Sequence, residues 1–154
     1  MSTSRSRLIP TGARSMSETA LLLDTHAAIW ITEGLPLATE ARDAIDAVQR
    51  AGSTIFVSPI SAWEIGLLVS RNRIGLSMRP ERWFQNVLAI PGVELAKLTP
   101  DILIESSFLP GTPPRDPADR IMIATARDIG ATLLTRDRLL LDYGASGQIK
   151  ALAC

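Results

Sequence analysis

The sequence predicts an α/β fold: a three-layer α/β/α sandwich around a mainly parallel sheet of about five strands. Short continuous apolar runs, such as 20–23 and 132–135, are typical of strands buried on both faces. Segments with helix-capping and helix-stopping residues separate these runs. No hairpin signal such as Asn-Gly joins one run to the next, so we expect parallel strands linked by helices.

Strands are expected where apolar and β-branched residues cluster, at 20–23, 53–57, 93–98, 132–135 and 149–153. Caps, prolines and glycines mark the helices between them, with Thr39 as one expected N-cap. We expect helices at 25–33, 39–50, from Ser58-Pro59 to 71–75, at about 80–89, from Thr99-Pro100, from Asp116-Pro117 to Gly130, and a short one ending at Tyr143.

Length and composition indicate one globular domain. The chain has 154 residues, 46% of them hydrophobic, and its 16 basic residues balance 16 acidic ones, so no overall basic bias indicates nucleic acid. A single His and a single Cys, Cys154, exclude a disulfide within the chain and a zinc site of the usual ligands. No apolar run approaches the roughly 18 residues of a membrane helix. We therefore expect a cytoplasmic protein without a membrane partner.

The first 17 residues differ from the rest. They carry Arg5, Arg7 and Arg14, no acidic residue, and no apolar segment of the secretory type. We expect residues 1–17 to be a disordered basic arm, or to precede a true start at Met16, and residues 18–154 to form the single domain.

Four acidic residues fall where the predicted strands and helices meet. Asp24 ends the first strand, and Asp137 lies just past the fourth. Glu64 lies in the first turns of the helix after the second strand, and Asp119 in the first turn of the helix before the fourth. Because ligands of open parallel sheets bind beyond the carboxyl ends of the strands, we expect all four at one edge of the sheet.

Asp116 precedes Asp119 by one helical turn, with Pro117 at the favourable first helical position. A spacing of three residues places both carboxylates on one face of that turn. Carboxylates at the mouth of a buried helix are costly unless a positive group meets them. The simpler interpretation is that Asp116 caps the helix and Asp119 completes a variant capping box.

The other acids also have simpler interpretations. Asp24 could cap the helix that follows it, and Glu64 could form a capping box with Ser61. Asp137 could be a turn residue paired with a neighbouring arginine. All these interpretations would have to hold together for the acids to have no common site.

Carboxylates crowded at one edge repel one another, and a hard divalent cation removes that repulsion. Mg²⁺ and Mn²⁺ prefer oxygen ligands, and in such sites they activate water and neutralise charge on a phosphate. Phosphodiester hydrolysis is the reaction that this pattern favours. The chain has no glycine-rich phosphate loop, and one His with a terminal Cys disfavours a nucleophilic triad.

Other polar and aromatic residues have open roles. His26 is close to Asp24 in sequence, although a lone His early in a helix is more often packed or solvated than catalytic. Trp63 and Trp83 are expected in the core or at a subunit interface. Six arginines either form a rim for a phosphate backbone or balance local charge: Arg71, Arg73, Arg115, Arg120, Arg136 and Arg138.

Four segments resemble the motifs of PIN domains, and most of all those of the VapC toxins of bacterial type II toxin–antitoxin pairs. They are Leu22-Leu-Asp-Thr-His-Ala-Ala-Ile-Trp30, Ser58-Pro-Ile-Ser-Ala-Trp-Glu-Ile65, Arg115-Asp-Pro-Ala-Asp-Arg120 and Leu133-Leu-Thr-Arg-Asp137. The resemblance runs from about Leu21 to the C-terminus. It implies a PIN-like fold and a Mg²⁺- or Mn²⁺-dependent endoribonuclease, usually a homodimer, that a VapB-like antitoxin silences.

The resemblance also assigns the acids. Asp24, Glu64, Asp119 and Asp137 match the first to fourth acids of the family, which bind the metal, and Asp116 is auxiliary. Many relatives carry His where this chain has Pro114, which puts substrate positioning in doubt but not the metal site. The arm before Met16 has no counterpart in the family pattern.

Two other classes of function are alternatives for this set of acidic residues. A catalytically idle PIN-like module would act only by binding a partner protein, and the intact acid set argues against it. A phosphoacceptor domain of the receiver type also gathers acids at strand ends, but it needs a lysine near the last strands. Lys150 is late and follows no matching motif.

Overall fold

The structure, a computed structural model, describes residues 19–154. The expected basic arm at 1–17 and the alternative start at Met16 lie outside the described residues, and a domain start at residue 18 stays a prediction. In the described part, no helix is long and apolar enough to cross a membrane.

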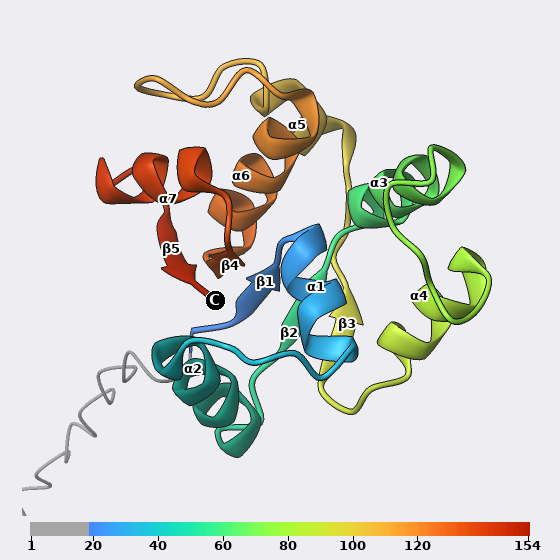
Figure 1. Cartoon of the computed structure of the whole chain (residues 1–154). Helices are drawn as coiled ribbons and strands as arrows, with labels where there is room; N and C mark the ends of the chain where they lie inside the picture. The colour runs from blue at the N-terminus through green and yellow to red at the C-terminus, as the bar shows by residue number, and fades with distance from the viewer. Residues whose placement is uncertain (1–18) are drawn as a thin grey trace, which may run out of the picture.

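Strands and helices alternate along the described chain, as predicted (Figure 1). The strands are β1 (Leu21–Leu23), β2 (Ile55–Val57), β3 (Val93–Leu95), β4 (Thr132–Thr135) and β5 (Lys150–Ala153). The helices are α1 (Thr25–Thr32), α2 (Thr39–Arg50), α3 (Pro59–Ser70), α4 (Pro80–Leu88), α5 (Pro100–Glu105), α6 (Pro117–Ile129) and α7 (Arg138–Ala145). The predicted strands at 53–57 and 93–98 are therefore shorter than expected.

The strands form a single parallel sheet with the order β3-β2-β1-β4-β5. The order changes direction between β1 and β4, because the chain first builds outward to β3 and then returns to the other side of β1. A crevice beyond the carboxyl ends of two such strands is where ligands bind in open α/β sheets. Receiver domains have the order 2-1-3-4-5 instead, so the phosphoacceptor alternative does not fit this sheet.

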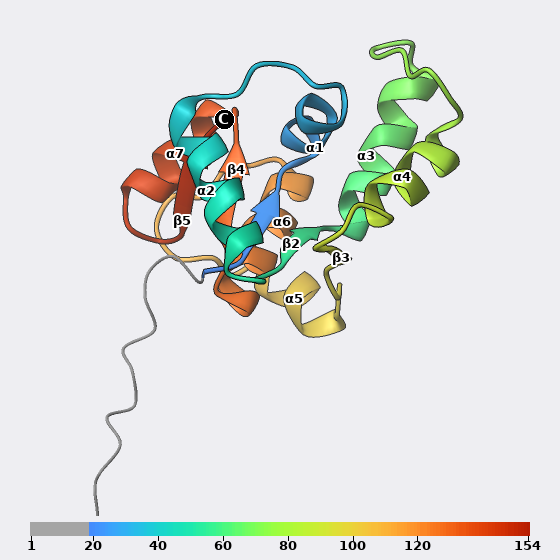
Figure 2. The same ribbon diagram turned by 90° about the horizontal axis from the view of Figure 1, so that it is seen from below.

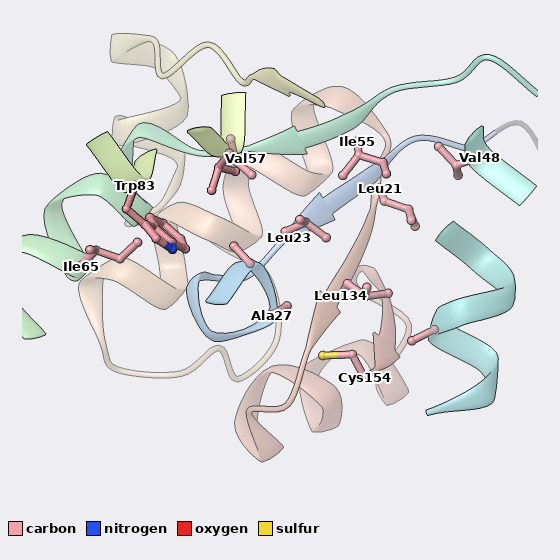
Figure 3. Packing of buried hydrophobic residues seen from close by; sticks show 13 residues of the cluster. Leu21, Leu23, Ala27, Val48, Ile55, Val57, Ile65, Trp83, Leu134 and Cys154 are labelled. Carbon is pink, nitrogen blue, oxygen red and sulfur yellow. The ribbon is translucent and has the colours of Figure 1, made fainter. Parts of the chain in front are cut away.

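Alternate residues of the central strand face two separate apolar layers. Leu21 and Leu23 of β1 belong to one buried cluster, which Figure 3 shows with Val48 of α2 at one end and Trp83 of α4 at the other. Leu22 belongs to a second cluster on the opposite face, with side chains from α6 and α7. Burial on both faces explains why this strand reads as a continuous apolar run.

The helices therefore form two outer layers, which confirms the three-layer sandwich. Side chains from α1, α2, α3 and α4 pack into the first cluster, and α6 and α7 pack into the second. Figure 2 shows α3 and α4 side by side, extending beyond the sheet. The helix α6 ends where predicted, because Gly130 adopts a left-handed conformation with φ of 64° that favours glycine.

One local prediction was wrong. Thr39 does not cap α2: the helix includes Thr39, and Ala38 occupies the cap position without a side-chain hydrogen bond. The two tryptophans differ, since Trp83 is buried in the core, whereas Trp63 is 57% exposed, and its place at a subunit interface stays a prediction. Ser58 and Thr99 do cap α3 and α5, each accepting a backbone N–H.

Candidate active site

The sequence-predicted acids lie at the carboxyl ends of β1 and β4, where the strand order changes direction. The backbone N–H of Asp24 donates to the carbonyl oxygen of Leu134 at 2.9 Å, so the end of β1 is fixed to β4. Asp24 and Asp137 leave the sheet from these two adjacent strands. The topology therefore places both side chains at the crevice that the fold offers to a ligand.

Asp24 is held at both carboxylate oxygens. Oδ1 accepts the backbone N–H of Thr25 at 2.8 Å, and Oδ2 accepts the hydroxyl of Thr135 at 2.7 Å. Asp24 is also the N-cap of α1, so the capping interpretation is correct as local geometry. A carboxylate has about four acceptor positions, so these bonds leave capacity for a further ligand.

Asp137 is the N-cap of α7. Its Oδ1 accepts the backbone N–H groups of Leu139 at 2.8 Å and Leu140 at 3.1 Å. Its own N–H donates to Thr135 Oγ1 at 3.0 Å, so Thr135 links Asp137 to Asp24. Within 19–154 no arginine forms an ion pair with Asp137, and the interpretation as a turn acid paired with a neighbouring arginine is wrong.

Glu64 projects from the second turn of α3 and accepts the hydroxyl of Thr25 at 2.7 Å. The capping box with Ser61 is wrong, because Ser58 caps this helix by accepting the N–H of Ile60 at 3.1 Å. Ser61 Oγ instead lies 2.9 Å from Thr25 Oγ1. Glu64 is therefore tied to α1 rather than to its own helix.

Asp116 and Asp119 begin α6. Asp116 is the N-cap and accepts the backbone N–H of Asp119 at 3.0 Å, which confirms the simpler interpretation for Asp116. The return bond of a capping box is not formed, and no described group donates a hydrogen bond to the carboxylate of Asp119. Asp119 is thus the acid with the least fixed side chain.

The acids act on one another electrostatically. Burial, followed by the negative charges of Asp116, Asp137, Asp24 and Glu64 in that order, raises the pKa of Asp119 to about 7. Burial also raises the pKa of Asp24 and of Glu64, and the hydrogen bonds from Thr135 and Thr25 partly offset this effect. The fold therefore brings together all five predicted acids in one anionic cluster, which we call the acid cluster.

No described lysine or arginine neutralises the acid cluster, since the one ion pair within 19–154 joins Arg79 and Glu81 on the surface. Arg120 follows Asp119 in sequence, but its guanidinium donates to the carbonyl oxygens of Pro114 at 2.8 Å and Ser106 at 3.3 Å. Local backbone contacts, rather than the adjacent carboxylate, thus hold this cation.

Arg136 is engaged in the same way. Its Nε donates to the carbonyl oxygen of Cys154 at 3.0 Å, and its guanidinium carbon lies 3.4 Å from the ring centroid of Trp30. Neither Arg120 nor Arg136 therefore balances the acids through an ion pair, and a rim for a phosphate backbone stays a prediction. His26 is exposed, and its nearby charge slightly offsets the raised pKa of Asp24 and of Glu64.

The donor chemistry of the acid cluster fits a hard divalent cation. All five side chains offer carboxylate oxygens, and a dication would relieve the repulsion among them. In the described part of the chain, no three His, Cys, Asp or Glu side chains are arranged as a ready-made metal group. The carboxylates would therefore have to turn toward a common point when an ion binds.

Sequence reasoning missed three buried hydroxyl residues in this site. Thr25 and Thr135 are 0% exposed and Ser61 is 1% exposed. Thr25 directly follows Asp24, and Thr135 lies two residues before Asp137. A threonine within two residues of a predicted ligand, at the end of a buried strand, is the signal that would have found two of them.

The chain is similar in sequence to known proteins. A family model described as the PIN domain matches residues 21–145. Ribonuclease VapC22 from Mycobacterium tuberculosis is 34% identical over 126 residues, which cover 81% of this chain and 92% of that protein. The residues that the family model matches include the whole acid cluster.

Solved structures with a similar fold include a chain of VapBC2 from Rickettsia felis, which was crystallised bound to a DNA fragment from the promoter. The TM-score is 0.57 at 16% identity, over 87% of this chain and 98% of that chain. A chain of FitAB bound to an IR36 DNA fragment has a TM-score of 0.51 at 18% identity, over 86% and 94%. At these identities the similarity concerns the fold.

Proposed function

The chain belongs to the PIN-domain family, and from that premise we propose that it is a metal-dependent endoribonuclease that acts as the toxin of a toxin–antitoxin pair. A relative that is named a ribonuclease and is 34% identical over most of both chains supports the activity.

The observation that carries this proposal is an acid cluster that no basic side chain neutralises. Five carboxylates from four segments of the chain lie together, burial and neighbouring carboxylates raise the pKa of Asp24, Glu64 and Asp119, and no described lysine or arginine is paired with the acids. Such an arrangement is costly for folding alone. It is useful where a divalent cation and a phosphate have to be held together.

Asp24, Glu64 and Asp119 are the proposed metal-binding residues, Asp137 completes the site, and Asp116 is auxiliary. A bound Mg²⁺ or Mn²⁺ would supply a Lewis acid that activates water and stabilises charge on the phosphate. The protein keeps Asp24 directed by two hydrogen bonds and Glu64 by one. Asp119, which accepts none from the described residues, can turn toward an arriving ion.

The proposed protein partner is a VapB-like antitoxin, and a homodimer is the proposed assembly. The similar folds occur in the structures named VapBC2 and FitAB, which supports a partner of this class. A ribonuclease silenced in this way would work in the cytoplasm, where its RNA substrate and its antitoxin are made.

Cleavage of RNA by the purified full chain tests the activity. We expect cleavage with Mn²⁺ or Mg²⁺ and none with EDTA, scored on separate tRNA, rRNA and mRNA pools. Glu64→Gln should abolish cleavage. Asp128→Asn is the matched control, because Asp128 is an exposed acid on α6 outside the cluster, and it should cleave like the wild type.

Inducible expression in bacteria tests the toxin role. Growth should stop when the wild-type chain is expressed and resume when the neighbouring small reading frame is expressed with it. Arrest that persists in the Glu64→Gln variant would contradict the ribonuclease as its cause. A chain that takes up no Mn²⁺ in calorimetry and leaves RNA intact would instead be an idle protein-binding module.

A further inference from the structure

We propose that Thr25 is a positioning residue that fixes two of the metal-binding carboxylates to each other, an inference that rests on the proposed function. Its backbone N–H donates to Asp24 Oδ1 at 2.8 Å, and its side-chain hydroxyl donates to Glu64 Oε1 at 2.7 Å. Asp24 comes from the end of β1 and Glu64 from α3, 40 positions later in the chain. One residue therefore sets the relative position of two ligands from distant segments.

The direction of these hydrogen bonds follows from counting protons. Thr25 Oγ1 lies within hydrogen-bonding distance of both Glu64 Oε1 and Ser61 Oγ, but a hydroxyl carries only one proton. An ionised carboxylate can only accept, so the proton of Thr25 belongs to Glu64. The hydroxyl of Ser61 then donates to Thr25, which gives a relay from Ser61 through Thr25 to Glu64.

Burial makes this relay costly to lose. Thr25 is 0% exposed and Ser61 is 1% exposed, so water does not reach either hydroxyl to replace a missing bond. The bond from Thr25 is the single one that Glu64 accepts from the described residues. Without it, the Glu64 carboxylate would be free to rotate away from the negative charge of Asp24.

The position of Thr25 also suits a precise task. It is the first residue of α1, directly after the N-cap Asp24, and its branched side chain restricts rotation about χ1. Val at this position would keep the shape and remove the hydroxyl, and Ser would keep the hydroxyl and remove the methyl group. These two substitutions separate positioning from packing.

The test is the affinity of the full chain for Mn²⁺, measured by calorimetry, with RNA cleavage measured alongside. We expect Thr25→Val to weaken Mn²⁺ binding by about 10-fold or more, as is usual for residues that orient metal ligands. The kcat for RNA should fall while KM changes little, because Thr25 is buried and offers no surface for RNA to contact. Thr25→Ser should restore Mn²⁺ affinity to near the wild-type value.

Thr32→Val is the matched control. Thr32 lies at the other end of α1, and its hydroxyl donates only to backbone carbonyl oxygens within the helix, at 2.9 Å and 3.0 Å. We expect its Mn²⁺ affinity and its cleavage rate to equal those of the wild type. This control shows what the loss of a helical threonine hydroxyl costs by itself.

Wild-type Mn²⁺ affinity in Thr25→Val would overturn the positioning role, even if that variant melts at a lower temperature. If Thr25→Val does not fold, Ser61→Ala decides instead: a Mn²⁺ affinity weakened less than 10-fold is expected, and an unchanged affinity contradicts the relay. A wild-type chain that binds no Mn²⁺ and cleaves no RNA would overturn the proposed function itself, which distinguishes the two failures.

Discussion

Asp24 and Asp119 belong to the same acid cluster but are held in opposite ways. Asp24 is 7% exposed and accepts hydrogen bonds at both carboxylate oxygens, from Thr25 and from Thr135. Asp119 is half-buried, and no described group donates a hydrogen bond to its carboxylate. Burial and four neighbouring carboxylates raise its pKa to about 7, with no hydrogen bond to lower it.

This difference separates two tasks in one site. Burial raises the pKa of Asp24, and its two hydrogen bonds partly offset that rise and fix the direction of the carboxylate, so Asp24 can serve as a fixed point before any ligand arrives. Asp119 keeps a proton near neutral pH and is free to turn, so it can close on an ion and release that proton. The carboxylate of Asp24, at the sheet, is therefore held in place, whereas the carboxylate of Asp119, on α6, can move.

The largest effect is expected for the fixed acid. Asp24→Asn removes a proposed metal-binding carboxylate that two hydrogen bonds hold in place, and RNA cleavage should fall by about 100-fold or more. The fold should persist, because an amide oxygen can still accept one of these hydrogen bonds. Cleavage assays with saturating Mn²⁺ and circular dichroism measure the two effects, and cleavage near the wild-type rate would remove Asp24 from the site.

The adjustable acid predicts how metal binding depends on pH. Asp119 is largely protonated below its pKa of about 7, so Mn²⁺ must displace that proton at pH 5.5 but not at pH 8. Mn²⁺ at 100 times its Kd should stabilise the fold by about 2.7 kcal/mol at pH 8, and the same concentration should do much less at pH 5.5. Equal stabilisation at both pH values, measured by thermal unfolding, would argue against a proton on Asp119.

Removing a support of the fixed acid should have an intermediate effect. Thr135→Val deletes the hydroxyl that donates to Asp24 and accepts the N–H of Asp137, and Thr135 is fully buried. The free energy of unfolding should fall by about 1–3 kcal/mol, because the buried carboxylate of Asp24 loses a hydrogen-bond donor. Thr135→Ser should recover most of that loss in denaturant titrations. No loss in the valine variant would contradict the described hydrogen bonds.

The smallest effect is a gain in stability without metal. Because the pKa of Asp119 is raised above its ordinary value, folding loses stability as pH rises from about 4 through about 7. Asp119→Asn carries no charge, so its melting temperature should exceed that of the metal-free wild type by a few degrees at pH 8 and by little at pH 4. A lower melting temperature than the wild type at pH 8 would mean that the charge of Asp119 is favourable.

The sequence predicted the order of the elements and the edge at which the acids gather. Apolar runs bounded by polar residues located β1 and β4 well, because both strands are buried on two faces. The cap at Thr39 was wrong because α2 begins one residue earlier than expected, with Ala38 at the cap position and no side-chain hydrogen bond there. The exposure of Trp63 could not be read either, since its neighbours on α3 are also apolar.

The connections within the site were beyond the sequence. A capping box between Ser61 and Glu64 was the local choice, but Glu64 is bound by Thr25, which lies far away in the chain. Local charge balance was one alternative for Arg136, but Trp30 and the carbonyl oxygen of Cys154 hold its guanidinium. Rules for capping and charge pairing consider residues that are close in sequence, whereas these partners come together only when the sheet has formed.

Anomalous diffraction from crystals of the full chain soaked in Mn²⁺ tests the central claim most directly. We predict a Mn²⁺ peak bonded to the carboxylate of Asp24 and to at least one of Glu64, Asp119 and Asp137, with Asp119 turned toward the ion. A peak that none of these carboxylates contacts, or no peak at saturating Mn²⁺, would contradict the claim that the acid cluster exists to hold a divalent cation.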